Sequence, residues 1–356
     1  MNPAVIGAVV GTVQLVFLLL LMMFVVVRRQ YDRERRRAFV AARDALAAPL
    51  RDWIVAGAHP DPVVRALRAL PPGTAVGYVS LLARQTIPES QRNELAMALR
   101  NEGWITAAVR RRGSRLWWRR LEAARALGLV GTAKDRDAVL RLLRDEHPAV
   151  QIAAVAALPR VADEALFGEV LDLLFAMPKV TRSYLTGFLR QRAATAAAPL
   201  AARIRGGGSS SDLSAWIGLA ASLDDPRALE AALAHAQHPT PFVRRTVARA
   251  LGRFAGPDAA RALADLVTDA DAAVRAAAAR SLGELGATGA VPLLAPLLGD
   301  SVWQVRLYSA LSLAQLGERG RAALRAAREG SDRFARDMAT MVSGLSDGAI
   351  LEMGQG

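Results

Sequence analysis

The chain has 356 residues and no cysteine, which excludes disulfide bridges, thiolate metal sites and a cysteine nucleophile. Apolar residues make up 52% of the sequence but aromatic residues only 5%, so the apolar content is mainly Ala, Leu and Val, which favours closely packed helices. The net charge is +13, and residues 28–43 and 110–120 together hold +11 of it, so the rest of the chain is close to neutral.

Residues 1–27 carry no charge, and the sequence from Ala4 to Val27 is apolar almost throughout. As a helix this stretch is about 36 Å long, enough to cross a hydrocarbon core of about 30 Å. It lacks the basic start and the small-residue cleavage site of a secretory signal. We therefore expect an uncleaved transmembrane helix over residues 1–27, followed by a basic juxtamembrane segment over residues 28–43. Because basic flanks stay in the cytoplasm, the prediction is a single-pass protein of the cell (inner) membrane, with its N-terminus outside and its repeats cytoplasmic.

Two features of this region indicate what the anchor contacts. Gly7 and Gly11 form a GxxxG step and Gln14 continues the same helical face, so these residues are candidates for transmembrane packing against another helix. Glycine is frequent in transmembrane helices generally, so ordinary composition is the alternative. The arginines of residues 28–37 are expected to lie near anionic lipid headgroups.

The rest of the chain is dominated by a regular repeat. Arg244, Arg275 and Arg306 are 31 positions apart, and each is followed by a leucine at the seventh position after it. The register continues back to Arg120 without an insertion, and the apolar residues of each unit recur with helical spacing. The prediction is an all-α fold in which pairs of helices, too short to bury their apolar faces alone, stack on their neighbours as an α-solenoid.

The repeat also divides the chain. Residues 44–114 contain irregularly spaced repeats, residues 115–343 are regular repeats, and residues 344–356 form a C-terminal tail. The Gly/Ser-rich segment 206–211 has the composition of a linker, but the register runs straight through it. We therefore expect a mobile loop between repeats, with Asp212 capping the next helix; a break into two blocks is the alternative.

The segment DAAVRAAAARSLGELGATGAVPLLAPLLGD, residues 271–300, resembles a HEAT-type repeat of the short variety also found in phycobilisome-lyase-like proteins. The resemblance is specific over residues 115–330 and weaker over residues 38–114. It implies an α-solenoid that holds partners, and it implies no particular chemistry. Within the units, glycines are expected to end the first helix of each pair, as Gly252 and Gly256 do in one unit and Gly283 and Gly286 in the next.

The sequence offers little for catalysis. Of the four histidines, His59, His147 and His238 precede proline, at turns or helix starts where polar side chains bind free backbone N–H groups. Residues 344–348, GLSDG, match G-x-S-x-G, but nothing nearby has the pattern of the strand that this motif needs. We find no metal, phosphate or dinucleotide motif. We therefore expect no enzyme activity, no metal and no cofactor.

The most basic stretch is VRRRGSRLWWRR, residues 109–120. The register explains part of it, because Arg120 is the repeated arginine and Trp117 takes the position of Trp303. Arg119 is unexplained, since it replaces a valine found in four other units. A charge there should face solvent or a partner, and Trp beside Arg is typical of interfaces. The predicted partner-binding residues are Arg110, Arg111, Arg112, Arg115, Trp118 and Arg119.

Other interpretations of this stretch remain open. Arg110 to Arg112 precede Gly113, where cations favour the negative end of a helix dipole and glycine ends the helix. Contact with anionic lipid is the next possibility. Nucleic acid ranks third, because a basic solenoid that grips it needs charge along many repeats, and here the other repeats are nearly neutral.

The function predicted from the sequence is a membrane-anchored cytoplasmic scaffold or adaptor that binds a protein partner. Bacterial proteins of this build imply, by analogy, a membrane-embedded partner enzyme such as a polysaccharide-synthesising glycosyltransferase. The alternative is a membrane-tethered solenoid that binds nucleic acid.

Overall fold

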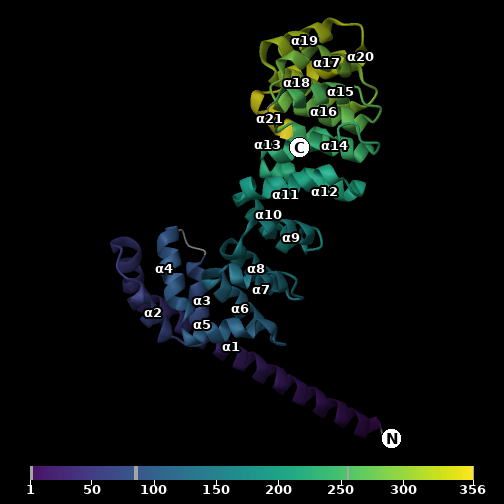
Figure 1. Cartoon of the computed structure of the whole chain (residues 1–356). Coiled ribbons are helices and arrows are strands. Elements are labelled where there is room, and N and C mark those ends of the chain that lie inside the picture. The colour runs from purple at the N-terminus through teal and green to yellow at the C-terminus, as the bar shows by residue number, and fades with distance from the viewer. Residues whose placement is uncertain (1–2, 84–86, 255, 356) are drawn as a thin grey trace. The chain divides into compact units, whose positions relative to one another are not determined.

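The computed structural model describes residues 3–83, 87–254 and 256–355, without the side chain of Gln355 and with only some of the side chains within residues 3–36. The described residues form helices and connecting segments, with no strand among them (Figure 1). The all-α class predicted from the helical periodicity is therefore confirmed. The chain divides into two compact units, Met1–Asp163 and Glu164–Gly356.

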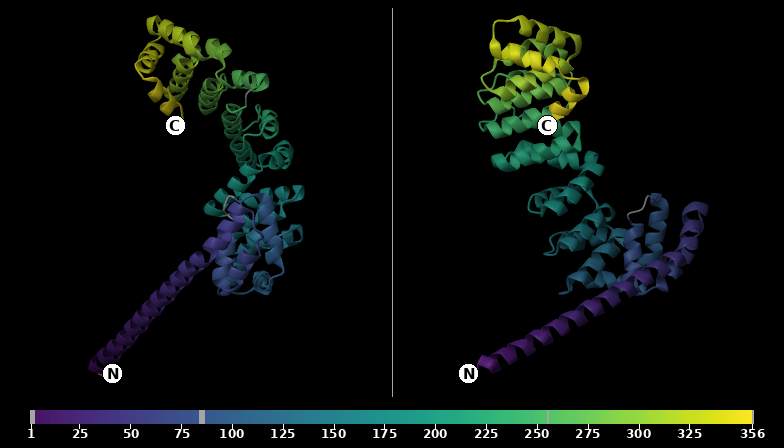
Figure 2. Two further views of the ribbon diagram at one scale, coloured as in Figure 1. Left: turned by 90° about the vertical axis from the view of Figure 1, so that its left-hand side faces the viewer. Right: turned by 180° about the vertical axis from the view of Figure 1, so that it is seen from behind.

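The first unit begins with α1 (Pro3–Ala56), a single helix that runs through the expected boundaries at residues 27 and 43 without a break. Its N-terminal part extends away from the other helices of this unit (Figure 2). Its C-terminal part packs against α2 (Asp61–Arg68) and α3 (Pro72–Leu82), where Leu46 and Trp53 are buried.

The residues predicted to pack within a membrane, Gly7, Gly11 and Gln14, lie outside the described side chains. The predicted span over residues 1–27 also falls for the most part on side chains outside that description. Among the residues that are described, no helix contains a stretch both long and apolar enough to cross a membrane.

The remaining helices of the first unit pack around α6, which contacts α3, α5 and α8. Their shared core includes Leu99, Ile105 and Leu129, each at most 1% exposed. These helices are α4 (Glu89–Arg100), α5 (Gly103–Arg110), α6 (Trp117–Val130), α7 (Arg136–Leu143) and α8 (Pro148–Val161).

The second unit is a stack of helical pairs. Helices α12, α14, α16 and α18 each pack against the next and form one layer, while α13, α15 and α17 pack beside them (Figure 1). The helices of this unit are α9 (Glu164–Leu174), α10 (Lys179–Gln191), α11 (Ala193–Gly206), α12 (Ser210–Leu223), α13 (Pro226–Leu233), α14 (Pro241–Leu251), α15 (Pro257–Leu266), α16 (Ala272–Glu284), α17 (Val291–Leu294), α18 (Trp303–Gln315), α19 (Gly317–Glu329), α20 (Arg333–Ser343) and α21 (Asp347–Gln355).

Two glycines predicted to end helices also lie where the next helix comes close. Gly252 follows the last residue of α14, as expected, and a Cβ atom on it would lie 2.7 Å from the Ser281 hydroxyl oxygen of α16. Of the two glycines predicted to stop the next helix, Gly283 lies inside α16, whereas Gly286 follows the helix as the left-handed residue, with φ +65°. A Cβ atom on Gly283 would lie 2.5 Å from the Ser312 hydroxyl oxygen. Gly283 therefore permits the close approach of α18 rather than ending α16.

The Gly/Ser-rich segment before α12 is partly helical, since α12 begins at Ser210. Ser209 caps the helix, and its hydroxyl accepts a hydrogen bond from the Asp212 N–H at 3.1 Å and donates one to Asp212 Oδ2 at 2.6 Å. The residue that caps this helix is thus Ser209 rather than Asp212. The division between the two units follows Asp163 and lies far from this segment.

Candidate functional site

The repeated arginine binds the next helical pair. Arg244 donates from Nε to Asp269 Oδ2 at 2.7 Å and from Nη2 to Oδ1 at 2.8 Å. Arg275 binds Asp300 in the same way, at 2.8 and 3.0 Å, and Arg120 binds Asp145 at 2.6 and 2.9 Å. In each pair the aspartate lies 25 positions after the arginine, and its side chain is at most 9% exposed. These arginine–aspartate pairs are structural, because their charges are already neutralised.

The histidines that precede proline act as the sequence predicted. The Nδ1 atoms of His59, His147 and His238 accept hydrogen bonds from the backbone N–H two residues later, at 3.4, 3.2 and 3.1 Å. Asp269 accepts the same kind of bond from the Asp271 N–H at 2.8 Å. Among the described residues, no group of three or more acidic or histidine side chains is placed to hold a metal ion.

The six predicted partner-binding residues are all exposed, which agrees with the reasoning that selected them. The valines that correspond to Arg119 in other units, such as Val243 and Val274, are completely buried, whereas Arg119 itself is exposed. The structure therefore confirms that Arg119 departs from the buried pattern. Whether these residues bind a partner stays a prediction.

The six residues do not share one recess. Arg110 and Arg112 line a recess of about 630 Å³ together with Arg141. Trp118 lines a different recess, and Arg115 and Arg119 line neither.

The recess lined by Trp118 is a groove of about 960 Å³ between α1, α3 and α6. It continues along α3 into a second recess, because the two share Gly73, Thr74 and Arg125. We call this combined feature the tryptophan groove. Its lining combines aromatic and aliphatic side chains, small residues on α3, and the charged residues Glu34, Glu122 and Arg125. The main uncharged lining residues are Phe39, Gly73, Thr74, Gly77, Leu81, Trp117, Trp118 and Leu121.

Trp117 has both a structural and a surface role. Its indole stacks on the His147 ring, with centroids 3.9 Å apart and planes 3° from parallel, and the Trp118 ring stands edge-on to it at 6.2 Å. Trp117 nevertheless remains 38% exposed and Trp118 48% exposed. Rigid aromatic rings that are half open to solvent can cover an apolar side chain of a partner at little entropic cost.

Sequence reasoning missed most of this groove. Phe39 and Leu81 are both 43% exposed and were not selected, and Trp117 was assigned to repeat structure alone. One feature of the sequence could have indicated the groove. Gly73 and Gly77 stand four residues apart on α3, so they leave two positions without side chains on the same helical face. A Cβ atom on Gly77 would meet nothing within 4 Å, so this face has open space above it.

Comparison with known proteins supports the repeat assignment. A family model for HEAT repeats matches residues 197–273 and 262–343, which is less than half of the chain. No curated protein matches the sequence significantly.

Matches to solved structures were also found. A mutant of Kap121p is 12% identical with a TM-score of 0.51; the match covers 87% of this chain but only 41% of Kap121p, so the likeness concerns the fold. The complex of CpcE and CpcF of phycocyanin lyase from Nostoc is 20% identical with a TM-score of 0.31, over 57% of this chain and 74% of that one. The Pds5–Scc1 complex is 9% identical with a TM-score of 0.41, over 89% and 60%.

Proposed function

Starting from an all-helical chain with HEAT-like repeats, we propose that this protein is a membrane-anchored scaffold that holds a protein partner at the tryptophan groove. The observation that carries the proposal is the pair Trp117 and Trp118, two large side chains left half exposed beside a groove partly lined by small residues. Large exposed aromatic side chains next to such a depression are the usual anchors of a protein interface.

The charged residues that line the groove itself are Glu34, Glu122 and Arg125, whereas five exposed arginines lie outside it and favour acidic residues on the partner beside its apolar anchor. Arg110, Arg111, Arg112, Arg115 and Arg119 lie near the start of α6, and all are exposed. Within the part of the chain that the structure describes, Arg111 alone of these five has a carboxylate close by, with its Nη1 atom 3.9 Å from Glu122 Oε2. Exposed cations beside an interface add little affinity each, but they steer the approach of an oppositely charged surface.

The proposed anchor is the uncharged stretch 1–27, with the arginines of residues 28–37 at anionic headgroups and the repeats on the cytoplasmic side. Helix α1 is continuous to Ala56, and its residues Glu34, Ala38 and Phe39 line the tryptophan groove. The axial distance from Val27 to Phe39 is about 18 Å at the helical rise per residue. A partner in the groove would therefore be membrane-associated, and we propose a membrane-embedded enzyme, such as a glycosyltransferase that makes a polysaccharide.

The test is photo-crosslinking in intact cells with the full chain. A photoreactive amino acid is placed at position 118, and a matched probe is placed at position 303, where Trp303 is similarly exposed and takes the repeat position of Trp117. We expect one membrane protein to be captured from position 118 and not from position 303, after detergent extraction and mass spectrometry. Identical background at both positions would overturn the proposal.

A second readout separates anchoring from partner binding. Trp118→Ala should abolish capture from a probe at position 121 while the protein stays in the membrane fraction. Recovery of the unchanged full-length chain in the soluble fraction would refute the anchor but would leave the groove proposal standing.

A further inference from the structure

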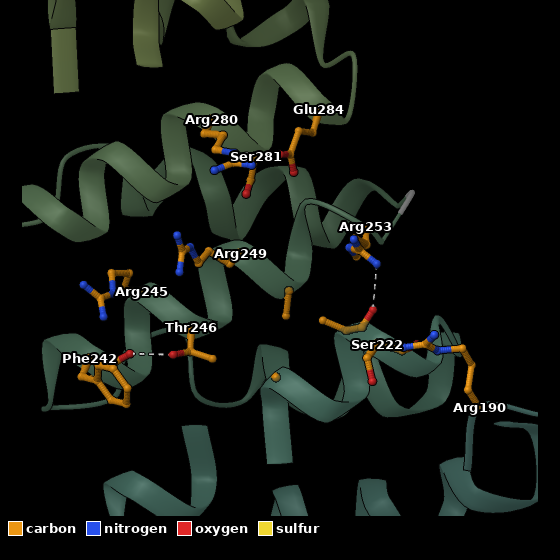
Figure 3. Close-up of a pocket in the computed structure, with 13 residues that line it drawn as sticks. Arg190, Ser222, Phe242, Arg245, Thr246, Arg249, Arg253, Arg280, Ser281 and Glu284 are labelled. Carbon is orange, nitrogen blue, oxygen red and sulfur yellow. Dashed lines mark hydrogen bonds and ion pairs between the residues drawn. The ribbon is translucent and has the colours of Figure 1, made fainter. Parts of the chain in front are cut away.

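The second unit contains a groove of about 910 Å³ that crosses α10, α12, α14 and α16 (Figure 3). We call it the arginine groove, because five arginines and only one acidic residue, Glu284, line it. The five are Arg190, Arg245, Arg249, Arg253 and Arg280. The remaining lining residues are mostly small.

Three of these arginines follow one another along α14 and its C-terminal end. Arg245, Arg249 and Arg253 are four residues apart, a spacing that keeps side chains on one helical face with about 6 Å between successive positions. Figure 3 shows these three side chains in a row across the groove, with Arg280 on the next helix. Arg280 is the repeat equivalent of Arg249, since the two are separated by one full repeat.

Small residues on the facing helix leave room in front of this row. Gly218, Ala221 and Ser222 of α12 line the groove, and Gly218 stands at the position that Arg249 takes one repeat later. A Cβ atom on Gly218 would meet nothing within 4 Å. The space is therefore large enough for a ligand side chain to lie beside the arginines.

The positive charge of the groove is poorly neutralised. Arg280 forms an ion pair with Glu284 at 2.8 Å. Arg253 donates to the Ala221 carbonyl at 3.3 Å, Arg190 donates to the Ser222 carbonyl at 3.2 Å, and Arg245 lies 5.2 Å from the centre of the Phe242 ring. Carbonyls and rings orient a guanidinium but carry no negative charge.

Arg249 has the fewest interactions of the three arginines in the row. Its side chain is exposed and forms no hydrogen bond or ion pair with the described residues. Arg244, five positions earlier, is held by both oxygens of Asp269. Arg244 and Arg249 therefore lie on the same helix, but the charge of Arg244 is neutralised by a carboxylate and that of Arg249 is not. Of these two, Arg249 is the one that faces the groove, where its charge can bind a ligand.

We propose that the arginine groove binds an acidic segment of a protein, with carboxylates held by Arg249 and its neighbours. A guanidinium matches a carboxylate with two parallel hydrogen bonds, as the arginine–aspartate pairs of this chain already show. Alternate side chains of an extended peptide are about 6.6 Å apart, which is close to the spacing of the arginine row. This proposal concerns a different surface from the tryptophan groove and stands or falls independently of it.

The extent of the charge favours a peptide over nucleic acid. Nucleic acid requires cations that continue along its backbone over many phosphates. Here the position of Arg249 and Arg280 is taken by Gly218 one repeat earlier and by the buried Leu311 one repeat later. The arginine row therefore serves a short anionic segment of a few carboxylates.

The test measures fluorescence anisotropy with the purified full chain in mild detergent. The probe is a labelled peptide that alternates Glu and Gly, and the matched probe alternates Gln and Gly. We expect binding of the Glu peptide that weakens steeply with added salt, and no binding of the Gln peptide. Equal binding of both peptides would overturn the proposal, and so would tighter binding of a labelled single-stranded oligonucleotide than of the Glu peptide.

Matched variants locate the site. Arg249→Glu should weaken the Glu peptide roughly tenfold or more, since a hydrogen-bonded charge contact is replaced by repulsion. Arg328→Glu is the control, because Arg328 is also exposed and also lies in the last turn of its helix. Gly218→Leu should reduce binding by filling the groove without changing its charge. A loss from Arg328→Glu equal to that from Arg249→Glu would contradict the proposed site.

Discussion

Arg244 and Asp269, which belong to successive helical pairs, are joined by two parallel hydrogen bonds of 2.7 and 2.8 Å. The backbone carbonyl of Asp269 accepts a further bond from Arg275 Nη1 at 2.8 Å, and Arg275 in turn binds the side chain of Asp300. Asp269 and Asp300 therefore each contact the arginine of the preceding repeat and the arginine of their own. Three successive repeats are connected in this way.

Removal of one carboxylate from this series should destabilise the protein. Asp269→Asn leaves the nearly buried Arg244 without its counter-charge, and we expect a loss of about 1–3 kcal/mol in the free energy of unfolding. The control is Asp258→Asn, because Asp258 pairs with Arg261 at the surface, with both side chains more than half exposed. Its effect should be within about 0.5 kcal/mol. Denaturant titration measures both, and equal effects would contradict a structural role for Asp269.

The same carboxylate predicts a dependence of stability on pH. The hydrogen bond from Arg244 holds the pKa of Asp269 below its usual value. Its stabilising contribution is therefore present above about pH 4, the ordinary range of an unfolded aspartate, and is lost as the pH falls through the lowered pKa of the folded state. The stability difference between the native chain and Asp269→Asn should shrink on acidification through this window. A difference that stays constant would show that the ionised carboxylate is not responsible.

The adjacent residues Arg119 and Arg120 should respond oppositely to charge reversal. Arg119 is exposed and replaces a buried valine, so Arg119→Glu should change the free energy of unfolding by less than about 0.5 kcal/mol. Arg120 is only 12% exposed and binds Asp145, so Arg120→Glu should cost about 3 kcal/mol or more. Thermal unfolding of the two variants decides the point, and a large loss from Arg119→Glu would make that residue structural.

Two glycines should respond oppositely to a methyl group. Gly283→Ala should destabilise the protein by about 1–3 kcal/mol, because the new Cβ atom would meet Ser312 at 2.5 Å. Gly218→Ala lies inside α12 with open space around it and should stabilise the protein by about 0.5–1 kcal/mol. The comparison requires only unfolding midpoints, and a stabilising Gly283→Ala would disprove the close approach of α16 and α18.

The sequence was sufficient for features that depend on local spacing. The repeat register, the helical class, the proline-linked histidines and the exposure of Arg119 all follow from neighbouring residues on one chain segment. The partner of Arg244 could not be predicted, because nothing in the sequence states which of several carboxylates the fold places opposite it. The close contact at Gly283 could not be predicted either, because the sequence does not distinguish a glycine that ends a helix from a glycine that lets two helices approach each other.

The grooves were harder still, because each combines side chains from three or more helices. Phe39 and Trp118 are 79 positions apart, and only the packing of α1, α3 and α6 brings them to one groove.

The net charge of the sequence did not show which arginines are free to bind a ligand. Arg244 and Arg249 count equally in the sequence, but the first is neutralised by Asp269 and the second faces the groove with its charge free.

The constant separation of 25 positions between arginine and aspartate has a consequence for how such a protein can change in length. If residues 245–275 were deleted, Asp300 would stand 25 positions after Arg244, in the place that Asp269 leaves. One whole repeat could thus be lost, or by the reverse event gained, without creating an orphaned charge. Within the run from Arg244 to Asp300, the spacing of the ion pair equals the spacing of the repeat less a constant, so the array can be shortened or extended there by recombination while the arginine at the new junction still meets an aspartate.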